Sequence, residues 1–236
     1  MFFDPLYFLL MIPAIGLSMW ASWRTKSAFN KFSRVRAMSG MTGAQAAQRL
    51  LDGAGIGDVK IVPVRGTLSD HYNPVNKTLA LSEPVYNSAS IAAVGVACHE
   101  AGHAIQHARK YAPMWLRSAL VPTANIGSKF GYFAMFGGLL LMGFMNPALG
   151  QKVVLFGALL FSAVLLFQIV TLPVEFDASR RAKMLAVRQG IVMETERRGM
   201  DKVLNAAAMT YVAAVISTLM TLLYFLIRAG LLGGRD

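Results

Sequence analysis

Four long stretches of the chain carry no charged residue, and they limit its fold more than any other feature does. They are Pro5–Trp23, Gly131–Gly150, Val153–Leu172 and Val203–Ile227. Each is close to or above the roughly 20 residues that a helix needs to cross the hydrocarbon core of a membrane. Since charged residues make up only 15% of the chain, too little polar surface remains to cover four such helices in water. The sequence therefore predicts a mainly α-helical integral membrane protein with about four transmembrane helices.

Basic residues are concentrated between these stretches. Of the 23 Lys and Arg residues, 13 lie in residues 24–129 and 7 lie in residues 173–205. Because Lys and Arg accumulate on the cytoplasmic side of membrane proteins, we expect both segments in the cytoplasm and both termini outside. Topology in a lipid bilayer thus explains the formal net charge of +11, and no basic run with interleaved aromatic residues indicates a nucleic-acid partner. We expect a multi-pass protein of the inner (cytoplasmic) membrane.

This pattern divides the chain into five segments. They are an N-terminal transmembrane helix (1–23), a cytoplasmic region (24–129), a transmembrane hairpin (130–172), a second cytoplasmic segment (173–205) and a C-terminal transmembrane helix with its tail (206–236).

Two helices are predicted within the first cytoplasmic region. Met41–Gly53 has the pattern of a short amphipathic helix, with Thr42 as its N-cap and a glycine at its end. A longer helix begins at Ser88 or Ser90 and runs to about Lys110. Its first half is built from small apolar residues, which indicates a buried helix.

Two strands are predicted between these helices. Val59–Val64 and Lys77–Ser82 are rich in apolar residues and are joined by a polar loop, the pattern of a short β-hairpin. Pro63 marks the first strand as an edge strand, because proline cannot donate a hydrogen bond to a neighbour. The region outside the membrane is therefore a small α+β domain.

The longer helix carries the motif His99-Glu100-Ala101-Gly102-His103. Residues four apart lie on one face of a helix, so both imidazoles can bind a single zinc ion while Glu100 acts as general base. Zinc lowers the pKa of water and polarises a scissile carbonyl. Gly102 leaves room for a second helix or a substrate backbone. The motif therefore predicts a zinc metallopeptidase with one catalytic Zn²⁺.

A catalytic zinc site needs a third protein ligand and an open position. The candidates are His71, His107 and a carboxylate from the second cytoplasmic segment. Glu175 and Asp177 lie there, directly after the third apolar stretch. Both could instead pair with the basic residues that follow them. The residues alone leave these alternatives open.

Several segments together resemble a known family. A His-Glu-x-Gly-His helix followed by a Glu-x-x-Ala segment after a hydrophobic hairpin is similar to the gluzincin-type membrane metallopeptidases, and the closer resemblance is to the YugP-like family of neutral zinc metallopeptidases. The segments that carry it are Gly66–Pro74, Ser90–His107, Leu172–Arg181 and Leu204–Ala214. The resemblance covers nearly the whole chain. It implies a zincin-like domain in which His99, His103 and Glu175 bind zinc and Glu100 is the catalytic base.

The resemblance also bears on the supporting residues. The more distant HtpX-like and CAAX-prenyl-protease-like peptidases usually carry Asp four residues after the ligand Glu, where it orients a zinc-binding His; this chain has Ser179 there. Ser179 or Asp177 could take this role. We expect His107 to support a ligand or the structure, and His71 either to fix its loop or to line the site. Tyr211 is a candidate hydrogen-bond donor to the developing oxyanion.

The leading hypothesis is a membrane-anchored zinc endopeptidase with its active site at the cytoplasmic face, acting on a protein or peptide whose extended backbone adds to an edge strand. One alternative is a site-2-type intramembrane protease. That class has an Asp-Gly motif in a later span, whereas Leu51-Asp52-Gly53 precedes the histidine motif here.

A second alternative is a non-proteolytic membrane scaffold or chaperone partner with a structural metal. Such a site usually has four protein ligands, and it would leave Glu100 without a role. The sequence is compatible with an oligomer or a regulatory membrane partner, because glycines that permit helix packing, within or between chains, occur at Gly127, Gly131, Gly137 and Gly138.

Overall fold

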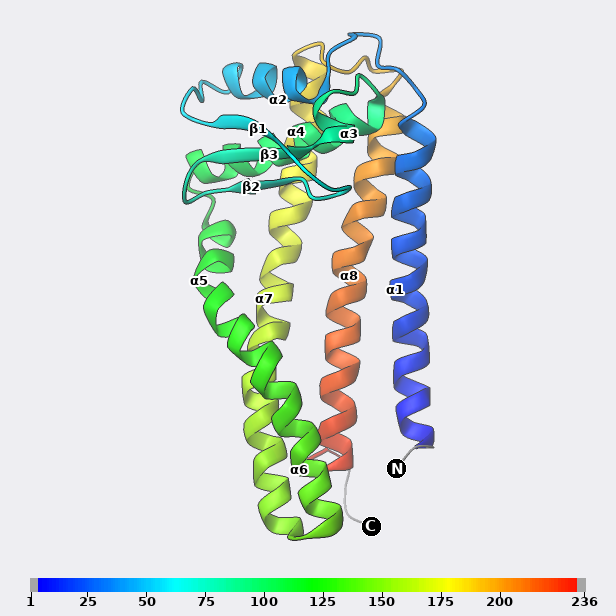
Figure 1. The fold of residues 1–236 in the computed structure, drawn as a ribbon, viewed down its shortest axis with the longest axis vertical. Helices are drawn as coiled ribbons and strands as arrows, with labels where there is room; N and C mark the ends of the chain where they lie inside the picture. The colour runs from blue at the N-terminus through cyan, green and yellow to red at the C-terminus, as the bar shows by residue number, and fades with distance from the viewer. Residues whose placement is uncertain (1–3, 233–236) are drawn as a thin grey trace. The chain divides into compact units, whose positions relative to one another are not determined.

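The structure is a computed structural model that describes residues 4–232 (Figure 1). Residues 1–3 and 233–236, the outer ends of the first and last predicted segments, lie outside the described residues. The chain forms two compact units. Within the described residues, one comprises residues 4–20, 116–171 and 211–232, and the other comprises Ala21–Trp115 and Leu172–Thr210.

Within the described residues, four helical runs are long and apolar enough to cross a membrane, as the sequence predicts. They are Pro5–Phe32 (α1), Ala112–Phe144, Pro147–Arg188 (α7) and Arg197–Arg228 (α8). The second run is made of α5 (Ala112–Ile126), a short π-helix η1 (Gly127–Gly131) and α6 (Tyr132–Phe144). The chain is therefore mainly helical, with the character of a membrane protein.

The apolar stretch Gly131–Gly150 is not a single span, and this prediction was wrong. α6 ends at Phe144, and α7 begins at Pro147. Asn146 Oδ1 accepts a hydrogen bond from the backbone N–H of Leu149 at 3.0 Å, and a proline fits the first turn of a helix because no partner for its nitrogen is needed there. These start signals separate two helices inside a run that hydropathy alone treats as continuous.

The core of the first unit is a small cluster of side chains from α1, α6, α7 and α8. Its buried members are Met11, Met135, Leu139, Val154, Ala158, Tyr224, Phe225 and Ala229. α6 and the beginning of α7 pack as a helical hairpin (Figure 1). A Cβ atom added at Gly138 would lie 2.9 Å from the carbonyl oxygen of Gly150, so these glycines let the two backbones approach. Gly138 thus serves a contact within this chain.

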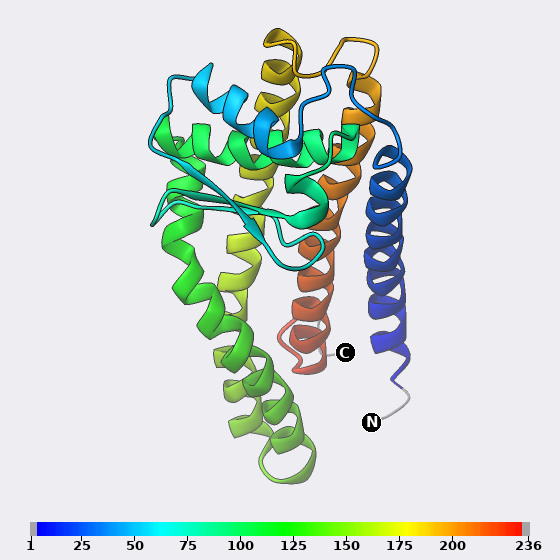
Figure 2. The ribbon, with the colours of Figure 1, turned by 45° about the horizontal axis from the view of Figure 1, so that its top comes forward.

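In the second unit, α2 (Gly43–Asp52) begins and ends where the sequence predicts. Thr42 and Gln45 form a capping box, in which each side chain bonds to the other residue's backbone N–H, and Gly53 is the C-cap. Leu50 and Leu51 are fully buried. α2 packs along α4 (Ile91–Ala108), and the two helices are seen together in Figure 2.

The sheet has three strands in the order β1-β3-β2, formed by Lys60–Val64 (β1), His71–Asn73 (β2) and Thr78–Ser82 (β3). The two predicted strands are present, but they pair in parallel, with Lys60 opposite Thr78. The predicted hairpin between them was therefore wrong. The polar loop itself turns back as β2, which pairs antiparallel with β3. β1 lies at an edge, as Pro63 predicts.

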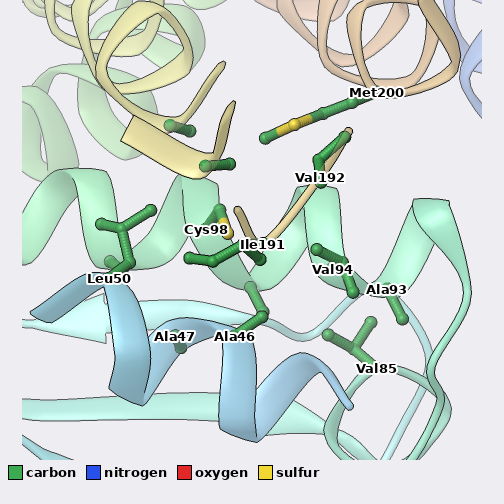
Figure 3. Close-up of a cluster of buried hydrophobic side chains, with 14 of the residues drawn as sticks. Ala46, Ala47, Leu50, Val85, Ala93, Val94, Cys98, Ile191, Val192 and Met200 are labelled. Atoms are coloured by element: carbon green, nitrogen blue, oxygen red, sulfur yellow. The ribbon is translucent and has the colours of Figure 1, made fainter. Parts of the chain in front are cut away.

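α4 follows the short helix α3 (Glu83–Tyr86) and is the centre of the second unit. Its N-cap is Ser90, whose side chain accepts from the N–H of Ala93 at 3.2 Å. Cys98 and Val94 of α4 pack with Leu50 of α2 and with the segment that includes Ile191 and Val192 (Figure 3). This apolar packing fixes α4 on one side and leaves its histidine-bearing face to α7.

Candidate metal centre

Three side chains with metal-binding atoms converge between α4 and α7. Each of His99, His103 and Glu175 offers one ligand atom, and these atoms all lie within 4.8 Å of one another. Glu175 Oε2 is 3.2 Å from His99 Nε2 and 3.5 Å from His103 Nε2. Between residues 4 and 232, no other group of three or more His, Cys, Asp or Glu residues meets this criterion. The set combines two nitrogen donors with one oxygen donor, which are ligand types that zinc accepts.

The backbone explains how the third side chain reaches the other two. His99 and His103 are one helical turn apart on α4, and the two rings meet edge to face with centroids 4.7 Å apart. α7 passes so close to α4 that a Cβ atom on Gly102 would lie 2.7 Å from the carbonyl oxygen of Ala178. Gly102 thus makes room for the helix that carries Glu175. Of the two possibilities that the sequence leaves open, a second helix or a substrate backbone, the structure shows a second helix.

The other ring nitrogen of each histidine is already hydrogen-bonded. His99 Nδ1 lies 3.1 Å from Ser179 Oγ, one turn beyond Glu175 on α7. His103 Nδ1 lies 3.0 Å from Gln106 Oε1, on its own helix. Both Nε2 atoms therefore face the Glu175 carboxylate. Metal-binding histidines typically show this arrangement, in which a partner holds the nitrogen that does not bind the metal.

The site concentrates negative charge away from water. Glu175 is 2% exposed and Glu100 is 8% exposed. Burial alone would lower the pKa of His103, but its contact with the Glu175 carboxylate, aided by the charge of Glu100, outweighs burial and raises that pKa above its ordinary value. Two buried carboxylates are costly without compensating positive charge. The donor set therefore fits a divalent cation.

Asp177 lies beside the cluster and contacts other groups. Its carboxylate accepts hydrogen bonds from Gln106 Nε2 at 2.9 Å and from Arg181 Nε at 2.5 Å, and it also pairs with Arg180. The guanidinium of Arg181 in turn lies over the ring of Tyr111, 5.7 Å from its centroid. For Asp177, the structure therefore shows the pairing with the following arginines that the sequence left open.

Gln106 is a site residue that the sequence analysis missed. It is fully buried and links His103 to Asp177. It lies three residues after His103, and this spacing places it on the same side of the helix. A glutamine at that spacing was therefore a readable signal beside a metal-binding histidine.

The remaining predicted residues lie outside the group of three. His107 Nδ1 is 2.8 Å from the hydroxyl of Tyr72 on β2. His71 is exposed, and its Nδ1 lies 2.9 Å from the carbonyl oxygen of Ser69, in the loop before β2. Tyr211 lies on α8 and belongs to the other unit, so its role stays a prediction.

These observations define a class: a helical protein of membrane character with a two-histidine, one-glutamate cluster suited to a metal. The chain belongs to the family described as "Putative neutral zinc metallopeptidase", which matches residues 7–230. It is 47% identical over 231 residues to the "Putative membrane protease YugP" of Bacillus subtilis (strain 168), covering 98% of this chain and 99% of that protein. The predicted resemblance to a YugP-like family is thereby confirmed. No solved structure matches the chain.

Proposed function

We propose that this protein is a membrane zinc metallopeptidase of the gluzincin type that hydrolyses peptide bonds. His99, His103 and Glu175 are the zinc ligands, and Glu100 is the general base. One observation carries the proposal. Both Nε2 atoms face the Glu175 carboxylate, while both Nδ1 atoms are held by other partners. The described function of the family supports the choice of metal and of reaction.

Three protein ligands leave one position open, which distinguishes a catalytic zinc site from a structural one. Zinc bound there would lower the pKa of a water molecule and polarise the scissile carbonyl. Glu100 follows His99 directly on α4 and is 8% exposed. Its carboxylate can take the proton of the attacking water and deliver it to the leaving amine.

We place the active site at the cytoplasmic face of the inner membrane. The 13 and 7 basic residues of the two segments that carry the site residues support this side. Burial also supports a site outside the bilayer. α4 is not among the candidate membrane spans of the described chain, and it packs into a core with α2 and the sheet. This packing argues against the site-2-type alternative.

The test uses the full chain purified in detergent without chelators. Zinc content is measured by elemental mass spectrometry, and hydrolysis is followed with a fluorophore-quenched unfolded protein. The wild type is compared with Glu175→Ala and Glu100→Gln. Glu194→Gln is the matched control, because that side chain is 68% exposed and pairs with a surface arginine, Arg197.

We expect about one zinc per chain in the wild type, in Glu100→Gln and in the control, and a sharp loss in Glu175→Ala. Hydrolysis should occur in the wild type and the control alone. Full activity in a zinc-loaded Glu100→Gln protein would overturn the assignment of the base. A wild type without zinc would overturn the metallopeptidase proposal and favour the scaffold alternative.

A further inference from the structure

We propose that Gln106 and Asp177 are positioning residues that fix the orientation and tautomer of His103, so that its Nε2 is presented to the metal. The inference rests on the proposed function, since it concerns the same metal centre. It adds two residues that do not touch the metal and assigns each a defined hydrogen-bonding task.

The first step is the orientation of the Gln106 amide. Its nitrogen Nε2 lies 2.8 Å from the carbonyl oxygen of Val174 and 2.9 Å from Asp177 Oδ2. A carbonyl and a carboxylate only accept hydrogen bonds, so the amide NH₂ must point toward them. The opposite orientation would place an oxygen against two oxygens. The surroundings therefore fix which end of this amide faces His103.

The second step follows from the first. Gln106 Oε1 lies 3.0 Å from His103 Nδ1, and an amide oxygen only accepts. His103 Nδ1 must therefore carry the hydrogen. In the neutral imidazole that binds a metal only one nitrogen is protonated, so a hydrogen held on Nδ1 leaves the lone pair on Nε2, on the side where Glu175 lies. The Gln106 contact thus selects the neutral tautomer that binds a metal through Nε2.

The third step is the anchoring of Asp177. This carboxylate is 5% exposed, and it is held by Arg181 at 2.5 Å and by Arg180. Arg181 lies over Tyr111, whose backbone N–H donates to the carbonyl oxygen of Gln106 at 2.9 Å. The contacts that hold Asp177 therefore lead back to the backbone of Gln106. Asp177 cannot turn without breaking several of these hydrogen bonds.

His99 is held differently. Its partner Ser179 has a hydroxyl, which can donate or accept a hydrogen bond, so this contact orients the ring without selecting a tautomer. Gln106 therefore fixes both the orientation and the tautomer of His103, whereas Ser179 fixes only the orientation of His99. Loss of the Gln106 contact should weaken metal binding more than loss of the Ser179 contact.

The experiment measures the zinc Kd of the metal-free full chain in detergent by competition with a chelator of known affinity. Gln106→Met keeps the length of the side chain and removes the accepted hydrogen bond. Gln189→Met is the matched control, because Gln189 lies in the same unit just beyond the end of α7, with its side chain against Gly53 at the C-cap of α2. The visible spectrum of the Co²⁺-loaded protein gives a second measurement, since it reports the geometry around the metal independently of activity.

We expect Gln106→Met to weaken zinc binding by about 10- to 100-fold and to change the Co²⁺ spectrum, as removal of such outer partners typically does. Gln189→Met should leave both unchanged. A Gln106→Met protein with wild-type zinc Kd and spectrum would overturn the inference. That result would leave the proposed function intact, because the proposed function is tested separately by the zinc content of the wild type and Glu175→Ala and by the activity of Glu100→Gln.

A reciprocal exchange keeps the inference testable if Gln106→Met does not fold. Gln106→Glu places a carboxylate against Asp177 and against the Val174 carbonyl oxygen, and it should weaken zinc binding. In Gln106→Glu/Asp177→Asn the new amide donates to the new carboxylate, which still accepts from His103 Nδ1, while the unfavourable contact with Val174 is the same in both variants. We expect the double variant to bind zinc more tightly than Gln106→Glu alone. A double variant no better than Gln106→Glu would count against the pairing.

Discussion

Gly102 of α4 lies directly against the backbone of Ala178 on α7, so that a Cβ atom at position 102 would be 2.7 Å from the Ala178 carbonyl oxygen. Gly102→Ala should therefore force the two helices apart and withdraw Glu175 from the histidines. We expect zinc affinity to fall by at least about 10-fold and the free energy of unfolding by about 1–3 kcal/mol. Thermal unfolding and chelator competition measure the two effects.

The control for this change is Gly57→Ala, because a Cβ atom at Gly57 meets nothing within 4 Å. It should leave zinc affinity unchanged. If Gly102→Ala binds zinc as tightly as Gly57→Ala, close approach of the helices is not needed for the third ligand.

Ser179 provides a second test. Ser179→Ala removes the hydroxyl that lies 3.1 Å from His99 Nδ1, so the ring loses its orienting partner. We expect zinc binding to weaken by about 10-fold, at the low end of the range for such partners. Ser179→Thr retains the hydroxyl and should bind zinc more tightly than Ser179→Ala. Equal affinities of the wild type and Ser179→Ala would show that packing alone orients His99.

Burial of Cys98 predicts a loss of stability at alkaline pH. Desolvation raises the pKa of this thiol from 9.0 to about 12 in the folded chain. The unfolded chain therefore loses the proton first, so the stabilising difference is complete below pH 9.0 and is lost as pH rises toward 12. The free energy of unfolding should fall by about 1.4 kcal/mol per pH unit in this window, relative to Cys98→Ala. Chemical denaturation at several pH values measures this difference, and parallel curves for the two proteins would contradict it.

Cysteine labelling tests the side of the membrane. The chain has a single cysteine, Cys98, and it is buried, so a new surface cysteine gives the main signal. Asn146 lies in the exposed turn between α6 and α7, and Thr195 lies in the exposed segment between α7 and α8. A membrane-impermeant maleimide applied to intact cells should label Asn146→Cys at once and Thr195→Cys only after permeabilisation. The reverse pattern would place the candidate site outside the cytoplasm.

The local structure of the second unit could largely be predicted from the sequence. The helix at α2 was predicted from a capping threonine, an apolar face and a terminal glycine, all of which act over a few residues. The spacing of His99 and His103 likewise depends only on helix geometry. Such signals depend on residues close together in the sequence and can be read from it directly.

The parts that depend on distant contacts were harder to predict. β2 has only three residues in a polar loop, and its strand conformation depends on pairing with β3. The choice of Glu175 over His71 or His107 stayed open because it depends on the packing of α4 against α7. The spacing of Gln106 from His103 could be read from the sequence, but its contact with Asp177, 71 residues further along the chain, could not.

The distance along the chain between the ligand candidates also has a consequence during synthesis. Glu175 follows His99 by 76 residues, and α5 and α6 are made in between. The first two donors therefore leave the ribosome well before the third. A growing chain can carry the complete motif of α4 without the carboxylate that completes the group. Under the proposed function, peptidase activity would begin only after α7 has emerged and packed, so the nascent chain and its neighbours on the ribosome would be spared cleavage by an unfinished enzyme.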